Sequence, residues 1–225
     1  MPVDDARART CYERSVALLR GSLTYARYFV AGELPDDFRD RFMRSIRHRV
    51  MKPLEPDDQD LERSGWCQVG DGNGLELAYS DVFWNEYINL GMRTDRWAIP
   101  GAMLRAKLKE AEAALLEKQG RERLSRKEKS ELKEFVARRL RHKLTPQSRV
   151  VDLSWAVNEG VVRFFTHSPK AAANLAELFG RTFKAFGLEL VPESPHTLRA
   201  RLGLTKSEES AWKSLESLVL AREET

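Results

Sequence analysis

Cysteine is scarce in this sequence. The chain holds two, Cys11 and Cys67, which lie far apart and have no CxxC partner. This usage favours neither a zinc site nor a disulfide framework. Cys67 directly follows Trp66, so we expect a small buried apolar residue and not a reactive thiol.

Long apolar runs are missing as well. No segment reaches the roughly 18 apolar residues that a membrane span needs, and the opening residues MPVDDARARTCYERS have no apolar stretch of the signal-peptide kind. We therefore expect a cytoplasmic protein. With 42% hydrophobic and 32% charged residues over 225 positions, the chain can bury one full core.

Catalytic signatures are also lacking. The sequence shows no G-x-S-x-G, Walker A, GxGxxG or HExxH pattern. The segment GDGNG at 70–74 has no following lysine or helix start, so it is expected to form a turn. We expect a protein that is not an enzyme, with no catalytic residues and no cofactor.

One acidic run deserves weighing as a metal site. Its members are Glu55, Asp57, Asp58, Asp60 and Glu62. Clustered carboxylates could hold Mg²⁺ for a nuclease. The run lies in a proline-containing stretch without a basic partner at a diagnostic spacing, so a surface loop is favoured and no metal is expected.

Positive charge is concentrated in one part of the chain. From Arg105 to Lys143 there are 14 Lys or Arg against 7 Asp or Glu, about +7, so the rest of the chain sums to about −3. A basic projection is typical of proteins that neutralise phosphates and release counterions. A solvated helix pair would carry the same charges, so both interpretations stay open.

Residues 100–146, the basic hairpin, are predicted to form two antiparallel helices. Gly120 ends the first helix, and Ser125 with Glu128 forms a capping box for the second. The residues expected to face inward are Leu104, Leu108, Ala111 and Leu115 on the first helix, and Leu132, Phe135, Val136 and Leu140 on the second.

The remaining patterns predict an α+β protein with an antiparallel or mixed sheet, packed helices and the protruding hairpin. Strands are expected at 21–30, 82–92, on both sides of 158–160 and at 188–192, with a loop at 51–74. Helices are expected after Asp37, after Ser168 and after Thr205. The first buries Phe38, Phe42, Ile46 and Val50 and exposes Arg39, Arg41, Arg44 and Arg47. The expected domains are a flexible leader at 1–20, a core at 21–99 and 147–200, the hairpin, and a C-terminal helix at 201–225.

With the hairpin between these strands, the chain resembles the RdgC family from about residue 21 to 198. The resemblance is carried by LTYARYFV, Gly65-Trp66, the R-x-D-x-x-x-I-P step from Arg93 to Pro100, RLSRKEKSELKEFV, VDLSWAVNEGVVRFFT, SPKAAANLAELF and LELVPESP. It implies a nucleoid-associated homodimer that surrounds double-stranded DNA without sequence preference and restrains RecA.

Carried over by position, the resemblance implies DNA contacts at Arg93, Arg96, Arg121, Arg123, Arg126, Lys129 and Lys143. It implies a dimer contact at His142, Leu144, Thr145 and Pro146. Family members continue for about another domain, which forms a second dimer contact. Both a closed ring and an open dimer are therefore compatible with the present sequence. Two other functions stay open: a protein-binding adaptor that uses the hairpin, and a metal-dependent nuclease that uses the acidic run.

Overall fold

The computed structural model describes residues 24–214. Its strands are β1 (Ala26–Ala31), β2 (Glu62–Cys67), β3 (Phe83–Trp84), β4 (Tyr87–Arg96), β5 (Gln147–Ala156), β6 (Val161–Phe164) and β7 (Glu189–Pro192). Its helices are α1 (Phe38–His48), α2 (Tyr79–Val82), α3 (Gly101–Gln119), α4 (Arg126–Arg141), α5 (Pro169–Phe183), the short 3-10 helix η1 (Lys184–Phe186), α6 (Pro195–Leu202) and α7 (Lys206–Lys213). The predicted leader at 1–20 lies outside these residues.

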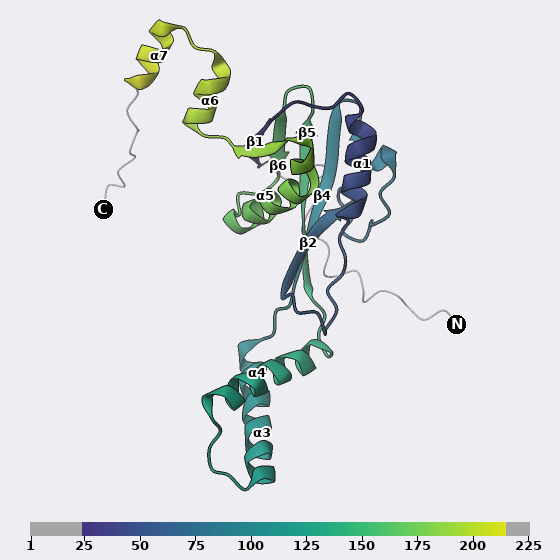
Figure 1. Cartoon of the computed structure of the whole chain (residues 1–225), viewed down its shortest axis with the longest axis vertical. Helices are drawn as coiled ribbons and strands as arrows, with labels where there is room; N and C mark the ends of the chain where they lie inside the picture. Colours follow the sequence, from purple (N-terminus) through teal and green to yellow (C-terminus); the bar gives the residue numbers. More distant parts are fainter. Residues whose placement is uncertain (1–23, 215–225) are drawn as a thin grey trace.

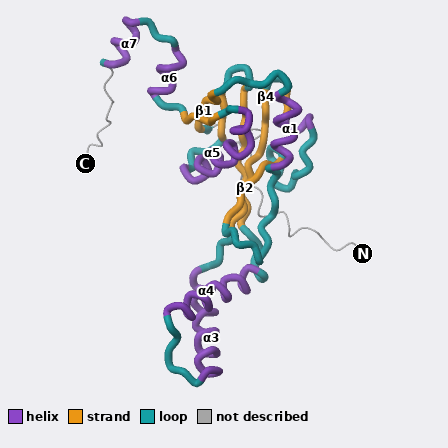
Figure 2. Tube along the Cα trace, in the orientation of Figure 1, coloured by secondary structure: helices purple, strands orange, loops and turns teal. Residues whose placement is uncertain are grey.

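The described strands form one antiparallel sheet in the order β2-β4-β5-β6-β1-β7, with β3 paired to β4. Helices α1 and α5 cover one face (Figure 1). Figure 2 shows the strands gathered in one body, from one end of which α3 and α4 project. The predicted α+β class is therefore confirmed.

An aromatic cluster fills the space between the sheet and these two helices. Trp155 of β5 stacks on Phe42 of α1 and meets the ring edge of Phe183 from α5. The buried Trp66 of β2 donates its indole N–H to Thr182 of α5 at 2.9 Å. Because all of these side chains are buried, the cluster holds α1 and α5 firmly against the sheet.

The loop predicted at 51–74 is wrong in part, because β2 lies within it. The strand pairs with β4 from Glu62 opposite Arg96 to Cys67 opposite Gly91. Gly65 has no space for a side chain, since a Cβ there would lie 2.4 Å from the Cα of Met51. The strand begins with two charged residues and contains a glycine, and both residue types have low β-propensity. It forms because its pairing with β4 outweighs that low propensity.

The strand predicted at 82–92 is broken in two. Asn85, with a φ of 56°, sits in the turn that separates β3 from β4, and such a φ is uncommon for a residue other than glycine. The predicted end of this strand at Met92 is also wrong, because β4 continues to Arg96 between β2 and β5. At the other end, α6 was not predicted, and the last predicted helix is described as far as Ser214.

Candidate nucleic-acid interface

The basic hairpin is an insertion between two paired strands. Residues of β4 and β5 pair along their whole length, from Tyr87 opposite Ala156 to Arg96 opposite Gln147. The chain leaves the sheet after Arg96, runs through α3 and α4, and returns at Gln147 (Figure 1). The last strand pair therefore fixes the base of the hairpin.

Local signals set the ends of its helices as the sequence predicts. Gly120 ends α3 with a left-handed φ of 62°, which glycine adopts without steric cost. Ser125 caps α4, since its hydroxyl accepts from the Glu128 N–H while the Glu128 carboxylate accepts from the Ser125 N–H. Arg121 pairs with the same carboxylate at 2.8 Å. Hydrogen bonds from Arg121 and Ser125 lower the pKa of Glu128 to about 2.

The two helices pack along narrow apolar stripes. Val136 and Leu140 of α4 are buried, and the predicted stripe of α3 is half-buried. Phe135, however, was predicted to face inward and is 59% exposed. The reason is geometric: neighbours on a helix lie about 100° apart, so Phe135 and Val136 cannot both face α3.

Phe135 instead borders an apolar groove on the outside of the hairpin. The groove has a volume of about 470 Å³ and is lined mainly by Met103, Ala111, Phe135, Val136, Leu140 and Leu144, with Lys107, Glu110, Arg139 and Lys143 around them. We call it the hairpin groove. Met103 is 40% exposed, so two large apolar side chains of this groove face solvent.

The end of α4 is attached to the body. Arg141 donates to the carbonyl oxygens of Pro56 and Asp58 at 3.3 and 2.8 Å, and the His142 ring lies 3.2 Å from the Asp57 carboxylate. The predicted dimer residues His142, Leu144, Thr145 and Pro146 follow directly and connect α4 to β5. They lie at the base of the hairpin, whereas the link between the two helices forms its far end (Figure 1).

Most cations of the hairpin point to solvent. Four of the 14 form ion pairs: Lys107 with Glu110, Arg121 with Glu128, Lys127 with Glu131, and Lys129 with Glu112. Nine others are exposed and form no ion pair with any described residue: Arg105, Lys109, Lys118, Arg123, Arg126, Lys133, Arg138, Arg139 and Lys143. The hairpin thus presents a surplus of uncompensated positive charge.

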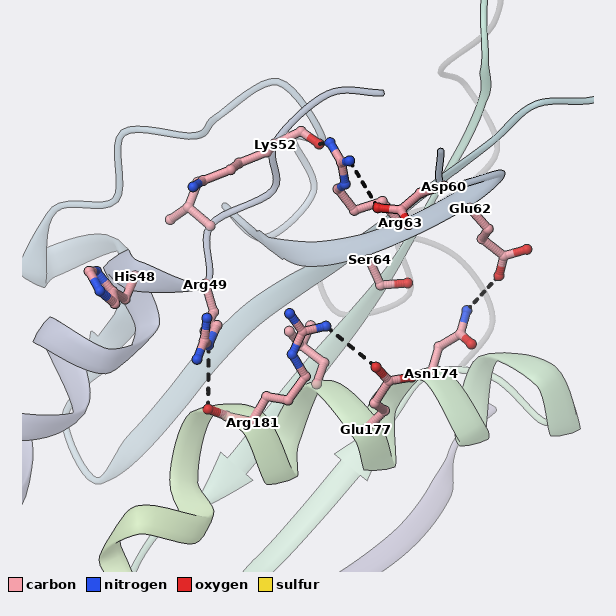
Figure 3. Close-up of a pocket in the computed structure, with 12 residues that line it drawn as sticks. His48, Arg49, Lys52, Asp60, Glu62, Arg63, Ser64, Asn174, Glu177 and Arg181 are labelled. Atoms are coloured by element: carbon pink, nitrogen blue, oxygen red, sulfur yellow. Dashed lines mark hydrogen bonds and ion pairs between the residues drawn. The ribbon is translucent and has the colours of Figure 1, made fainter. Parts of the chain in front are cut away.

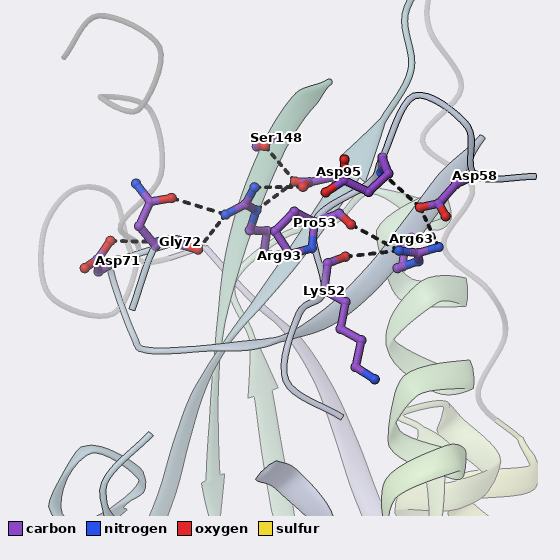
Figure 4. Close-up of polar contacts among 11 residues, drawn as sticks. Lys52, Pro53, Asp58, Arg63, Asp71, Gly72, Arg93, Asp95 and Ser148 are labelled. Carbon is purple, nitrogen blue, oxygen red and sulfur yellow. Dashed lines mark hydrogen bonds and ion pairs between the residues drawn. The ribbon is translucent and has the colours of Figure 1, made fainter. Parts of the chain in front are cut away.

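The two arginines predicted at the sheet edge differ sharply. Arg93 is 8% exposed, and its guanidinium donates to both Asp95 oxygens at 2.7 Å and to the Gly72 carbonyl at 3.0 Å (Figure 4). Arg93 therefore stabilises the sheet and does not present its charge to solvent. Arg96, at the end of β4, is exposed. Residues i and i+2 share a face of a strand, so the pairing of Arg93 with Asp95 was readable from their spacing.

The carboxylates of the acidic run are distributed among separate partners. Arg63 holds Asp58 at 2.9 Å (Figure 4) and Asp60 at 3.0 Å (Figure 3). Glu62 binds Lys170 and Asn174 of α5. Within residues 24–214, no three His, Cys, Asp or Glu side chains gather as a metal site would require.

A polar hollow of the body lies beside this run, between the β2 edge and α5 (Figure 3). Its volume is about 460 Å³. Its carboxylates all have partners on its own wall: Asp60 with Arg63, Glu62 with Asn174, and Glu177 with Arg181. The contact of Glu62 with Asn174 connects β2 to α5, whereas the other two each join residues three or four positions apart in the sequence. All three contacts have a structural role.

None of the helices within residues 24–214 combines the length and the apolar character that a membrane crossing demands. No curated protein matches the chain. A family model described as "RdgC: Putative exonuclease, RdgC" matches residues 39–200, which is well over half of the 225 positions. The matched region includes every described strand except β1, nearly all of α1, the whole of α5 and the whole basic hairpin. The chain therefore belongs to the RdgC family.

Proposed function

We propose that this protein binds double-stranded DNA through backbone phosphates, without reading base sequence, and that it modulates recombination at the nucleoid. The observation that carries the proposal is the set of nine exposed hairpin cations that have no carboxylate partner among residues 24–214. Family membership is consistent with a recombination-related, DNA-binding role. Phosphate contacts position a protein on a duplex without conferring sequence preference.

The seven predicted contact residues differ in whether their charge is free to contact a phosphate. Arg96, Arg123, Arg126 and Lys143 are exposed and form no ion pair with the described residues. Arg121 and Lys129 would share their charge with Glu128 and Glu112. We leave Arg93 out of the proposed interface because its guanidinium is buried against Asp95.

The test removes two available cations near the far end of the hairpin. In Arg123→Ala/Arg126→Ala, the slope of log K against log [salt] for a random duplex should become shallower by about 2, close to 0.9 per lost contact. Fluorescence anisotropy over a salt series measures this slope.

The matched control removes the same charge from the body. Arg27 and Arg163 face each other on β1 and β6 and pair with Glu193 and Glu159. Arg27→Ala/Arg163→Ala should leave the slope unchanged. Equal effects from the two variants would mean that net charge, and not the hairpin, determines binding.

We also propose that two copies associate through the hairpin groove. Its exposed Phe135 and Met103 are the apolar residues that a second copy would bury, and Leu144 of the predicted dimer contact lines the same groove. Aromatic residues and methionine are enriched in the cores of protein interfaces.

The same groove favours a second candidate function, a protein-binding adaptor whose partner, RecA included, binds the hairpin. In that case the cations only keep the hairpin solvated. A gel shift separates the two candidates, because the adaptor predicts no DNA retention even at about 50 mM salt, where phosphate contacts are strong.

The family description also names an exonuclease. We propose binding without cleavage, because the acidic run is engaged by Arg63, Lys170 and the His142 ring. Incubation of an end-labelled duplex with Mg²⁺ or Mn²⁺ tests this proposal. If the wild-type protein shortens the labelled strand and an Asp58→Asn/Asp60→Asn variant does not, the protein is a nuclease instead.

A further inference from the structure

A second cationic surface lies on the body, along the exposed side of α1. Arg41, Arg44 and Arg47 recur at every third position of this helix, and we call them the arginine row. They border an open hollow of about 620 Å³ that is also lined by Ser45, His48, Arg49 and Phe186. Among the described residues, none that lines it is a carboxylate, in contrast to the paired charges in the hollow between β2 and α5.

The guanidinium groups of this surface are bound mainly to neutral atoms. Through Nε, Arg44 donates to the Asp40 carbonyl at 3.4 Å, Arg47 to the Leu77 carbonyl at 3.2 Å, and Arg49 to the Arg181 carbonyl at 3.4 Å. Figure 3 shows the last of these contacts at the end of α1. Among the described residues the one ion pair of the row joins Arg41 to Asp37, at 3.5 Å. The terminal nitrogens of Arg44 and Arg47 are therefore directed to no described carboxylate.

Helix stability does not account for the row. Cations in the last turn of a helix interact favourably with its dipole, which explains Arg47 and His48 but not Arg41 and Arg44. Like charges three or four residues apart repel one another, and the row contains two such neighbouring pairs. An anionic ligand would relieve this repulsion.

The spacing of the row suits a linear polyanion. At a rise of 1.5 Å per residue, Arg41 and Arg47 lie about 9 Å apart along the helix axis. A DNA strand carries one phosphate per roughly 3.4 Å of its axis, so the row can face two or three successive phosphates. Arginine also binds phosphate oxygens through two parallel N–H groups.

We propose that the arginine row is a second contact with nucleic-acid backbone phosphates, separate from the basic hairpin. The inference rests on the proposed function, since it adds a surface to the same DNA-binding activity. Because α1 lies on the body and the hairpin projects from the end of β4 and β5 (Figure 1), the two surfaces contact different stretches of backbone.

The test uses the two row members that make no hydrogen bond to another structural element. Arg41→Gln/Arg44→Gln should make the log K against log [salt] slope shallower by about 2 for a random duplex. The charge-preserving Arg41→Lys/Arg44→Lys should retain the wild-type slope. Arg27→Gln/Arg163→Gln, which removes equal charge from β1 and β6, should also retain it.

The outcomes separate this inference from the proposed function. If the Gln variant keeps the wild-type slope while Arg123→Ala/Arg126→Ala flattens it, the row does not contact phosphate and the inference is overturned. If wild-type protein shows no salt-dependent duplex binding, the proposed function fails and the inference fails with it. If Arg41→Lys/Arg44→Lys also makes the slope of log K against log [salt] shallower, the row has a structural role, and this result too overturns the inference.

Discussion

At the scale of single residues, burial decides what a reactive group can do. Cys67 is fully buried in β2, opposite Gly91, where a Cβ would lie 2.7 Å from the Cys67 sulfur. Burial, helped by the nearby Asp152 carboxylate, raises the pKa of the Cys67 thiol to about 12. The thiolate is the nucleophilic form, so a structural and unreactive thiol is expected.

Thiol labelling tests this expectation. In a Cys11→Ser variant, Cys67 should remain unmodified by an alkylating reagent at about pH 8, close to the pKa of a free cysteine, until denaturant unfolds the sheet. Modification of the folded protein at the rate of a free thiol would contradict the burial of this side chain.

Thr182 is a second residue on which the core depends. Its hydroxyl accepts from the Trp66 indole and donates to the Leu178 carbonyl at 2.7 Å. Thr182→Val keeps the shape but leaves the buried indole N–H without a partner. We expect a loss of about 1–3 kcal/mol in the free energy of unfolding, measured by denaturant titration. A loss of less than a few tenths of a kcal/mol in this free energy would mean that the Trp66 indole N–H finds another acceptor.

At the scale of elements, the capping box at the far end of the hairpin stabilises α4. Ser125→Ala removes the N-cap oxygen and should cost about 1 kcal/mol of helix stability. Faster amide hydrogen exchange in α4 would report this loss. Ser130→Ala, at an exposed position in the same helix, is the matched control and should not speed exchange, because alanine favours helix interiors.

The same cap predicts a pH dependence. The pKa of Glu128 falls from 4.5 to about 2 on folding, so the carboxylate stabilises the folded hairpin above its unfolded pKa. That contribution is lost as the pH falls from 4.5 through about 2. The protection of α4 amides from hydrogen exchange, corrected for the intrinsic exchange rate at each pH, should therefore fall over this range, and Glu128→Gln should abolish the change. An unaltered response in Glu128→Gln would exclude this carboxylate as its cause.

Elements with local signals were predictable from the sequence, and elements defined by distant partners were not. Gly120 and the Ser125 cap mark the link of the hairpin because the backbone itself requires those residue types. By contrast, β2 exists because β4 pairs with it over six residues. Nothing local to its sequence, ERSGWC, reveals that partner.

The candidate site shows the same division. The basic character of residues 105–143 follows from composition alone, but the availability of each charge depends on tertiary contacts. Arg93 is buried with Asp95, and Phe135 faces outward because Val136 takes the inward position. The row on α1 was visible in the sequence as an arginine face. Its interpretation needed the structure, in which none of the described residues that line the hollow beside it is a carboxylate.

At the scale of the whole molecule, the hairpin combines a cationic surface with an apolar groove. Phe135→Glu places a charge where a second copy would pack, so the mass in sedimentation should fall from dimer to monomer. Leu202→Glu is the matched control, because Leu202 of α6 is 58% exposed, close to the 59% of Phe135. A wild-type protein that sediments as a monomer would overturn the proposed dimer.

The most direct test of the account is the salt dependence of wild-type binding to two duplexes of unrelated sequence. If the hairpin cations contact phosphates, both duplexes should bind equally well, and affinity should fall steeply between about 50 and 200 mM salt. Binding that hardly changes with salt, or that strongly prefers one duplex, would contradict the account.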